Sequence, residues 1–174
     1  MTNGKRIGGS CHLVLGEDVN TDEIIPGRYL VSIDSAELAP HAFEPLGKDV
    51  QAKLARSKVI TAGRNFGCGS AREQAASCLV GAGVRAVLAK SFARVFYRNA
   101  INTGLAVIES PAAVAAVSEG DEVYVDLAEG SVEVNGKKFD IPPYPAQLRQ
   151  VLDAGGLIPY LRAEFQKRPA DERV

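Results

Sequence analysis

The stretch Val59-Ile60-Thr61-Ala62-Gly63-Arg64-Asn65-Phe66-Gly67-Cys68-Gly69-Ser70-Ala71-Arg72-Glu73-Gln74 places three glycines within seven residues directly after an apolar run. An alanine-rich segment with helical spacing of small residues follows it. Glycine readily adopts the backbone angles of tight turns, so this order predicts a strand, then a tight turn, then a helix that opens at Ser70.

Two further strand patterns follow that helix. Arg85 to Lys90 has an apolar centre, and Leu105 to Ile108 is apolar throughout. Between them, Ser91 is a suitable cap for a helix that runs to about Ile101. The β-α-β-α-β order over residues 58–108 predicts parallel strands that are joined by helical crossovers.

The rest of the chain predicts antiparallel strands and further helices. The expected elements are a strand over 11–15, a short helix from Asp34, strands over 122–126, 132–134 and 137–141, and helices over 146–154 and 157–168. Asn135-Gly136 is typical of a two-residue hairpin turn. We therefore expect an α/β fold with a mixed parallel and antiparallel sheet flanked by helices. It forms one domain over 1–168, and a flexible tail follows over 169–174.

Composition limits the possible functions. The chain has 174 residues, of which 46% are hydrophobic, and no apolar run approaches the roughly 18 residues that span a bilayer. The three cysteines form no Cys-x-x-Cys pair, and only two histidines are present. This favours reduced thiols in a cytoplasmic protein that has no metal site of its own and no membrane partner.

Charge is unevenly distributed along the chain. Residues 57–108 carry seven Lys or Arg and one acid, Glu73, so this segment has a formal charge of +6 while the whole chain has −1. A basic segment around a glycine turn favours an anionic ligand. The chain pI of about 6.1 and the lack of a nucleic-acid-binding motif argue against nucleic acid.

Two interpretations of Ser70 remain open from these patterns. A turn that opens a helix aims backbone N–H groups, the Ser70 hydroxyl and Arg72 at one point, which suits a carboxylate or a phosphate. Ser70-x-x-Glu73 is also a capping box, in which the two residues only stabilise the start of the helix. The glycine spacing matches neither a P-loop nor a dinucleotide fingerprint.

Three motifs in order along nearly the whole chain point to a family. They are Asp18-x-Asn-Thr21-Asp22-x-Ile24-Ile25-Pro26, Gly63-Arg-Asn-Phe-Gly-x-Gly-Ser-x-Arg-Glu73 and Ser91-Phe-Ala-Arg-x-Phe-x-Arg-Asn99. Together they resemble the small subunits of the isopropylmalate dehydratases in the aconitase superfamily. The resemblance implies a swivelling β/β/α domain that stands as its own chain. It also implies a large dehydratase subunit that carries a [4Fe–4S] cluster, while this chain binds no cofactor.

The resemblance also implies a reaction and its residues. Such enzymes reversibly remove and re-add water on a hydroxy di- or tricarboxylate, here in leucine biosynthesis. Ser70 corresponds to the base that removes a proton, and Arg72 and the amides of the glycine turn stabilise its alkoxide. Gly69 and Ala71 flank it as substrate contacts. Ala71 departs from the family pattern, which has a second serine there, so one hydroxyl contact to a carboxylate is missing.

A second segment is expected to contact the side group of the substrate and to determine which side group is accepted. The loop that holds Arg28, Tyr29 and Leu30 follows the first motif, and by resemblance it leans over the substrate. Arg28 suits a carboxylate-bearing arm, whereas Leu30 and Val31 suit a branched alkyl group. The alternative for Arg28 is a solvated surface position. Of Arg64, Arg94 and Arg98, we expect at most one to touch a ligand.

Other functions fit the same residues. Homoaconitate and methylmalates of the citraconate type are alternative substrates within the class. A non-catalytic, anion-binding module that keeps the swivel fold is an alternative from a different class. Ser70, Arg72 and the loop around Arg28 are all intact, and this argues against the non-catalytic reading.

Overall fold

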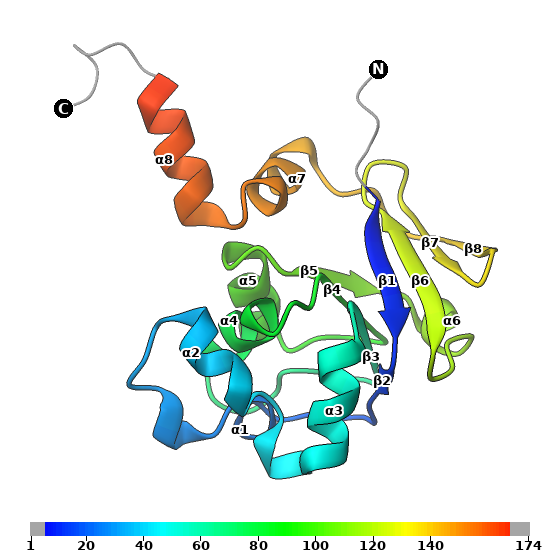
Figure 1. The fold of residues 1–174 in the computed structure, drawn as a ribbon. Coiled ribbons are helices and arrows are strands. Elements are labelled where there is room, and N and C mark those ends of the chain that lie inside the picture. The colour runs from blue at the N-terminus through cyan, green and yellow to red at the C-terminus, as the bar shows by residue number, and fades with distance from the viewer. Residues whose placement is uncertain (1–5, 168–174) are drawn as a thin grey trace.

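The computed structural model describes residues 6–167 and shows two four-stranded sheets, with most helices on one side and α6 beside the antiparallel strands (Figure 1). In chain order the elements are β1 (Ile7–Cys11), β2 (Leu13–Val14), α1 (Thr21–Ile24), η1 (Gly27–Tyr29), α2 (Ser35–Leu38), η2 (Ala39–His41), η3 (Glu44–Leu46), α3 (Lys48–Arg56), β3 (Val59–Ala62), α4 (Gln74–Gly81), β4 (Ala86–Ala89), α5 (Arg94–Asn102), β5 (Ala106–Glu109), α6 (Pro111–Val114), β6 (Asp121–Asp126), β7 (Ser131–Val134), β8 (Lys137–Asp140), α7 (Ala146–Asp153) and α8 (Leu157–Lys167). The tail expected over 169–174 lies outside the described residues.

The parallel sheet confirms the β-α-β-α-β prediction. Its strand order is β2-β3-β4-β5, and all neighbouring strands in it run parallel. The helices α4 and α5 connect β3 to β4 and β4 to β5. Every residue of β3 and β4 is buried, which explains why both strands read as continuous apolar runs rather than as alternating patterns.

The antiparallel strands form a separate sheet with the order β1-β6-β7-β8. Asn135 and Gly136 both have positive φ values, 47° and 84°, which confirms the hairpin turn between β7 and β8. The sequence predicts one mixed sheet, but the structure has two. The strand expected over 11–15 is divided, because β1 pairs with β6 and ends at Cys11, whereas β2 pairs with β3.

The glycines of β1 explain why its start is missed. A Cβ atom on Gly8 would lie 2.2 Å from the carbonyl oxygen of Val123 on β6, the residue before its partner Tyr124. Only a glycine allows the two backbones to approach this closely. In a sequence, consecutive glycines such as Gly8 and Gly9 indicate a turn instead.

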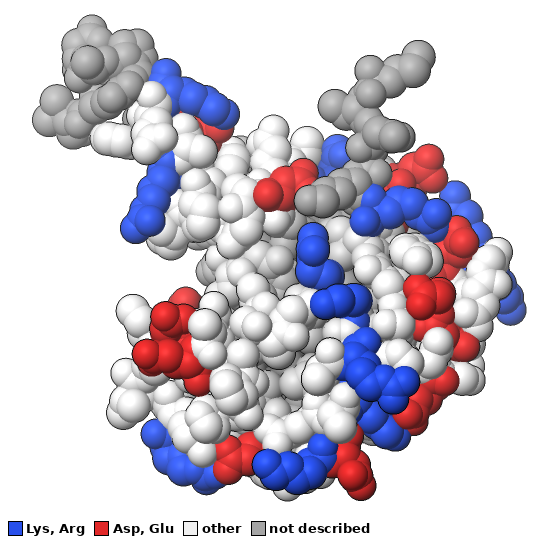
Figure 2. All heavy atoms as spheres, viewed as in Figure 1, with Lys and Arg blue, Asp and Glu red and all other residues white. Residues whose placement is uncertain are grey.

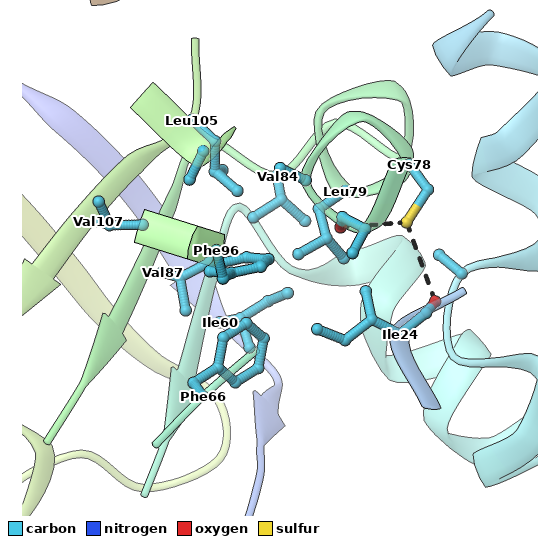
Figure 3. Packing of buried hydrophobic residues seen from close by; sticks show 14 of the residues in the cluster. Ile24, Ile60, Phe66, Cys78, Leu79, Val84, Val87, Phe96, Leu105 and Val107 are labelled. Atoms are coloured by element: carbon cyan, nitrogen blue, oxygen red, sulfur yellow. Dashed lines mark hydrogen bonds between the residues drawn. The ribbon is translucent and has the colours of Figure 1, made fainter. Parts of the chain in front are cut away.

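Two buried clusters establish the order of the layers. Ile60, Val87 and Val107 of the parallel sheet pack with Leu79 of α4 and Phe96 of α5, as Figure 3 shows. A second cluster lies on the opposite face of the parallel sheet, between the two sheets. It contains Val59, Leu88 and Ile108 from the parallel strands and Val123, Val125 and Val132 from the antiparallel ones. The layers are therefore antiparallel sheet, parallel sheet and helices, which confirms the β/β/α arrangement.

Candidate functional site

The segment 63–73 leaves the carboxyl end of β3 and is held against the segment 16–21. The backbone hydrogen bonds run from Asp18 N to Arg64 O (2.8 Å), from Gly67 N to Val19 O (2.8 Å) and from Thr21 N to Cys68 O (2.8 Å). Asn65 adds a side-chain bond to Asp18, with Nδ2 donating to Oδ1 over 2.8 Å. We call residues 63–73 the glycine loop. Because it is fixed by partners about fifty residues earlier in sequence, its shape depends on tertiary contacts.

Two positions in the glycine loop require glycine. Gly67 has a φ of 78°, and a Cβ atom there would lie 2.2 Å from Cγ of the buried Phe96. Gly69 has a φ of 92°, and its Cβ atom would lie 2.5 Å from Oδ1 of Asn20. Both positions combine a left-handed backbone with close packing, so any other residue strains the loop.

Ser70 does not start a helix, and the capping-box interpretation is wrong. Helix α4 begins at Gln74, and its N-cap, Glu73, forms no side-chain capping bond. The Thr21 hydroxyl donates to the carbonyl oxygen of Ser70 over 3.0 Å, which holds this residue next to α1 instead of in a helix. Within residues 6–167, the hydroxyl of Ser70 forms no hydrogen bond, and the residue is exposed.

The capping box lies in α1. The Asn20 side chain accepts a hydrogen bond from Asp22 N over 2.9 Å, and the Glu23 carboxylate accepts one from Asn20 N over 2.8 Å. Asn20 is therefore a structural residue of the site that the sequence analysis missed. The pattern Asn20-x-x-Glu23 is the signal that could have revealed it.

Consecutive backbone donors surround Ser70. Among the described residues, no acceptor pairs with the backbone N–H groups of residues 69–73. Gly69, Ser70 and Ala71 are exposed, so a ligand can reach them. Because their N–H groups have no acceptor among the described residues, no hydrogen bond within the protein is broken when a ligand binds. A series of unpaired amides beside a hydroxyl is a suitable environment for a carboxylate or an alkoxide.

Arg72 forms two contacts that the sequence does not predict. Its guanidinium donates to Oδ1 of Asp22 and, over 3.3 Å, to the carbonyl oxygen of Ile25. Only 15% of its side chain is exposed, against 57% for Asp22. Arg72 thus connects the glycine loop to α1, and part of its charge is compensated by Asp22. From the sequence we expected Arg72 to help to stabilise the Ser70 alkoxide, and this role stays a prediction.

The segment 27–33, which we call the side-group loop, begins with η1. Arg28 donates to Oε1 of Glu44, and the hydroxyl of Tyr29 donates to Oε2 of Glu44 over 2.7 Å. The ring of Tyr29 stacks on His41, with 3.6 Å between centroids and 12° between planes. Leu30 is partly buried against the cluster between the parallel sheet and the helices, which we call the helix-side core. Arg28 is therefore paired and not simply solvated, although 61% of its side chain is exposed.

The side-group loop and the glycine loop are neighbours. Nε2 of Gln74, at the start of α4, donates to the carbonyl oxygen of Leu30 over 3.3 Å. A Cβ atom on Gly27 would lie 3.8 Å from Nη2 of Arg72. The structure thus places the two loops of the sequence prediction at one site. His41 and Glu44 belong to it as well, and no sequence pattern indicates them.

The positive charge of residues 57–108 is partly compensated. Glu17 pairs with Arg64 over 3.3 Å and with Lys90 over 3.5 Å. Arg94 and Arg98 on α5 are exposed and form no ion pair with any described residue. Figure 2 shows basic side chains in a band down the middle of this face, with acidic side chains beside the band and gathered over α2. The positive charge of the sequence segment is therefore only partly compensated in the folded chain.

The three cysteines lie at separate places. Cys11 is hydrogen-bonded to Thr61, Cys78 lies in the helix-side core (Figure 3), and Cys68 donates to the carbonyl oxygen of Asp18 over 3.3 Å. Burial raises the pKa of the Cys78 thiol to about 12. No group of three metal-binding side chains occurs within residues 6–167. These thiols do not fit an iron–sulfur cluster. In the same range, every helix is too short or too polar to cross a bilayer.

Known proteins resemble this chain over most of its length. A family model described as the aconitase C-terminal domain matches residues 46–113, which include β3, the glycine loop and β5. The 3-isopropylmalate dehydratase small subunit of Moorella thermoacetica is 45% identical over 157 residues, covering 89% of this chain and 94% of that protein. The one from Pyrobaculum calidifontis is 49% identical over 152 residues, with coverages of 86% and 94%. A crystal structure of 3-isopropylmalate dehydratase from Methanocaldococcus jannaschii matches with a TM-score of 0.81 and 41% identity, covering 92% of this chain and 95% of that one.

Proposed function

The chain belongs to the family of the 3-isopropylmalate dehydratase small subunits, and on this premise we propose that it forms part of a hydro-lyase that interconverts 2-isopropylmalate and 3-isopropylmalate by dehydration and rehydration. The enzyme would act in leucine biosynthesis. One observation carries the proposal: the exposed hydroxyl of Ser70, which has no partner among residues 6–167, lies beside five consecutive N–H groups at the carboxyl end of a parallel sheet. Ligand sites are common at this end of such sheets.

Ser70 is the proposed base. It would remove the proton from the carbon next to a substrate carboxylate, and the Ser70 hydroxyl would carry that proton until water is added again. A serine alkoxide needs stabilisation, and the unpaired N–H groups of residues 69–73 supply it in place of the helix terminus expected from the sequence. Gly69 and Ala71 would contact the substrate through their backbone N–H groups. Ala71 leaves this role intact, because no side-chain hydroxyl is needed for it.

Arg72 is the second proposed catalytic residue. Its bonds to Asp22 and to Ile25 fix the direction of the guanidinium, and its remaining donors are available to a substrate carboxylate. Such a fixed, partly buried arginine loses little conformational entropy on binding a ligand. Arg72 would therefore orient the carboxylate next to the carbon that Ser70 deprotonates.

The side-group loop would hold the other end of the substrate. Arg28, Tyr29 and Leu30 are the proposed contacts, and Val31 follows them with 94% of its surface exposed. Leu30 and Val31 provide apolar area that suits an isopropyl group. The pairing of Arg28 with Glu44 reduces the attraction for a carboxylate at this point, so the geometry favours isopropylmalate over homoaconitate.

The cysteines do not fit a cluster, so we propose that a large subunit supplies a [4Fe–4S] cluster, whose open iron would act as a Lewis acid on the substrate hydroxyl. The partner would cover the exposed loops and exclude water from them. Three free cysteines agree with a reducing, cytoplasmic location. We propose that residues 1–168 form one domain.

The test is anaerobic reconstitution of the complex with its large subunit. Steady-state kcat/KM is then measured for 3-isopropylmalate, a methylmalate and homoaconitate. We expect isopropylmalate to be the best of the three. A higher value for another hydroxy acid would reassign the substrate within the class. A complex that assembles with its cluster and turns over none of them would support the non-catalytic alternative.

A further inference from the structure

Glu44 is the centre of a four-residue cluster at the side-group loop. Its carboxylate accepts hydrogen bonds from Arg28 on Oε1, and on Oε2 from the Tyr29 hydroxyl and from Nδ1 of His41 over 3.1 Å. The Arg28 guanidinium lies over the Tyr29 ring, 4.8 Å from its centroid, and the same ring stacks on His41. Each member thus touches at least two others.

The cluster joins three short elements whose backbone is also held by bonds such as that from Phe43 N to the carbonyl oxygen of Ile24. Arg28 and Tyr29 belong to η1, His41 ends η2, and Glu44 begins η3. Each of these elements is a single 3-10 turn of three residues. Such turns are not stable alone, so the side-chain contacts between them contribute to the orientation of the side-group loop.

We propose that Glu44 is a positioning residue that determines the substrate selectivity of the side-group loop. Its carboxylate fixes Arg28 and Tyr29 and compensates the charge of Arg28 within the protein, so that the loop offers an uncharged surface to the substrate's side group. This inference rests on the proposed function of the chain and adds a residue to it.

The chemistry of the cluster supports this role. Hydrogen bonds from Tyr29, His41 and Arg28 lower the pKa of the Glu44 carboxyl, which is therefore charged at neutral pH. A substrate carboxylate that approached Arg28 would be repelled by this charge and would compete with it for the same guanidinium. An alkyl group meets neither cost. Discrimination by such opposing charges is a common way to obtain specificity.

The test uses Glu44→Gln, which removes the charge and retains the size and an acceptor oxygen. In the reconstituted complex, we measure kcat and KM for 3-isopropylmalate and for a hydroxy tricarboxylate. The kcat/KM ratio of tricarboxylate to isopropylmalate should rise about tenfold, because a freed arginine gains a charge-assisted bond. The change should appear in KM, since this contact is made before and during the reaction alike.

Two further variants separate positioning from general stability. Glu119→Gln breaks the ion pair between Glu119 and Lys53, whose charged atoms lie 2.6 Å apart and whose two side chains are about equally exposed. This control variant should leave the kcat/KM ratio of tricarboxylate to isopropylmalate unchanged. Arg28→Ala combined with Glu44→Gln should abolish the gain for the tricarboxylate. If the gain persists in this double variant, Arg28 is not the group that Glu44 controls.

Limited trypsin digestion of the isolated chain adds a result that does not depend on activity. Cleavage after Arg28 should become faster in Glu44→Gln than in the wild type and in Glu119→Gln, because the η1 turn is released. If Glu44→Gln leaves either the substrate ratio in an active complex or the cleavage rate unchanged, the inference about Glu44 is overturned while the proposed function still stands. A wild-type complex that turns over only the tricarboxylate overturns the proposed function as well.

Discussion

Substituting Ser70 by alanine separates the catalytic role of this residue from a structural one. The sequence pattern predicts a loss of about 1 kcal/mol from a lost helix cap. The structure removes that term, because α4 begins at Gln74 and the Ser70 hydroxyl has no partner within the described residues. The free energy of unfolding should therefore change by no more than about 0.5 kcal/mol, as is typical of exposed positions.

The effect on turnover should be large. A methyl group cannot accept the substrate proton, and a positioned general base contributes roughly 10²- to 10⁴-fold to a rate. We expect kcat of the reconstituted complex to fall by at least this factor, with assembly and the cluster unaffected. Thermal unfolding of the isolated chain, in which 1 kcal/mol shifts Tm by about 2–4 °C, measures the structural part.

Asn20→Ala is the matched control for this experiment, because Asn20 does cap a helix beside the same loop. It should cost about 1 kcal/mol of stability. If Ser70→Ala retains most of the activity, Ser70 is not the base. If Ser70→Ala lowers Tm as much as Asn20→Ala does, the Ser70 hydroxyl stabilises the fold, which the structure does not predict.

Further predictions test the loop, the thiols and the cofactor. Gly67→Ala should lower the free energy of unfolding by about 2 kcal/mol, measured by urea denaturation, because its Cβ atom would lie 2.2 Å from Phe96; an unchanged midpoint would contradict the left-handed turn. At pH 8, iodoacetamide should label Cys68 before Cys78, whose pKa is raised to about 12. Peptide mass spectrometry measures the order of labelling, and the reverse order would contradict this prediction. Ala71→Ser should retain activity and stability, measured by kcat and Tm, because this side chain is exposed. Anaerobic reconstitution of the isolated chain should yield no stoichiometric cluster by thiolate-to-iron absorbance, and a stable one would refute the need for a large subunit.

The sequence predicts the centre of this fold well, for a physical reason. The strands β3 and β4 are covered on both faces, so nearly all of their residues are apolar, and the glycine turn after β3 interrupts the pattern clearly. The start of β1 is missed because Gly8 and Gly9 pack against a neighbouring strand, whereas glycine pairs usually indicate turns. Local patterns report burial reliably, but they do not show which backbone a glycine faces.

The site could be predicted only in part. The two loops, Ser70 and Arg72 follow from the motifs, and the structure brings them together. The environment of Ser70 does not follow, because the helix begins only at Gln74 and the carbonyl group of Ser70 binds Thr21 instead. Glu44 was missed because it lies sixteen residues after Arg28, and no local rule relates an acid to an arginine at that distance on separate turns.

The four-residue helix α1 connects the parts of the proposed site. Thr21 binds the carbonyl group of Ser70, and Asp22 binds Arg72. The chain then continues directly from α1 into the side-group loop that begins at Gly27. A displacement of α1 would therefore move the proposed base and the proposed side-group contacts together. Residues that share such a short segment are expected to show non-additive effects when two are substituted. Selection of the side group and placement of the reacting carbon would thus depend on the same helix, which is anchored because Ile24, its last residue, and Ile25 are buried in the core.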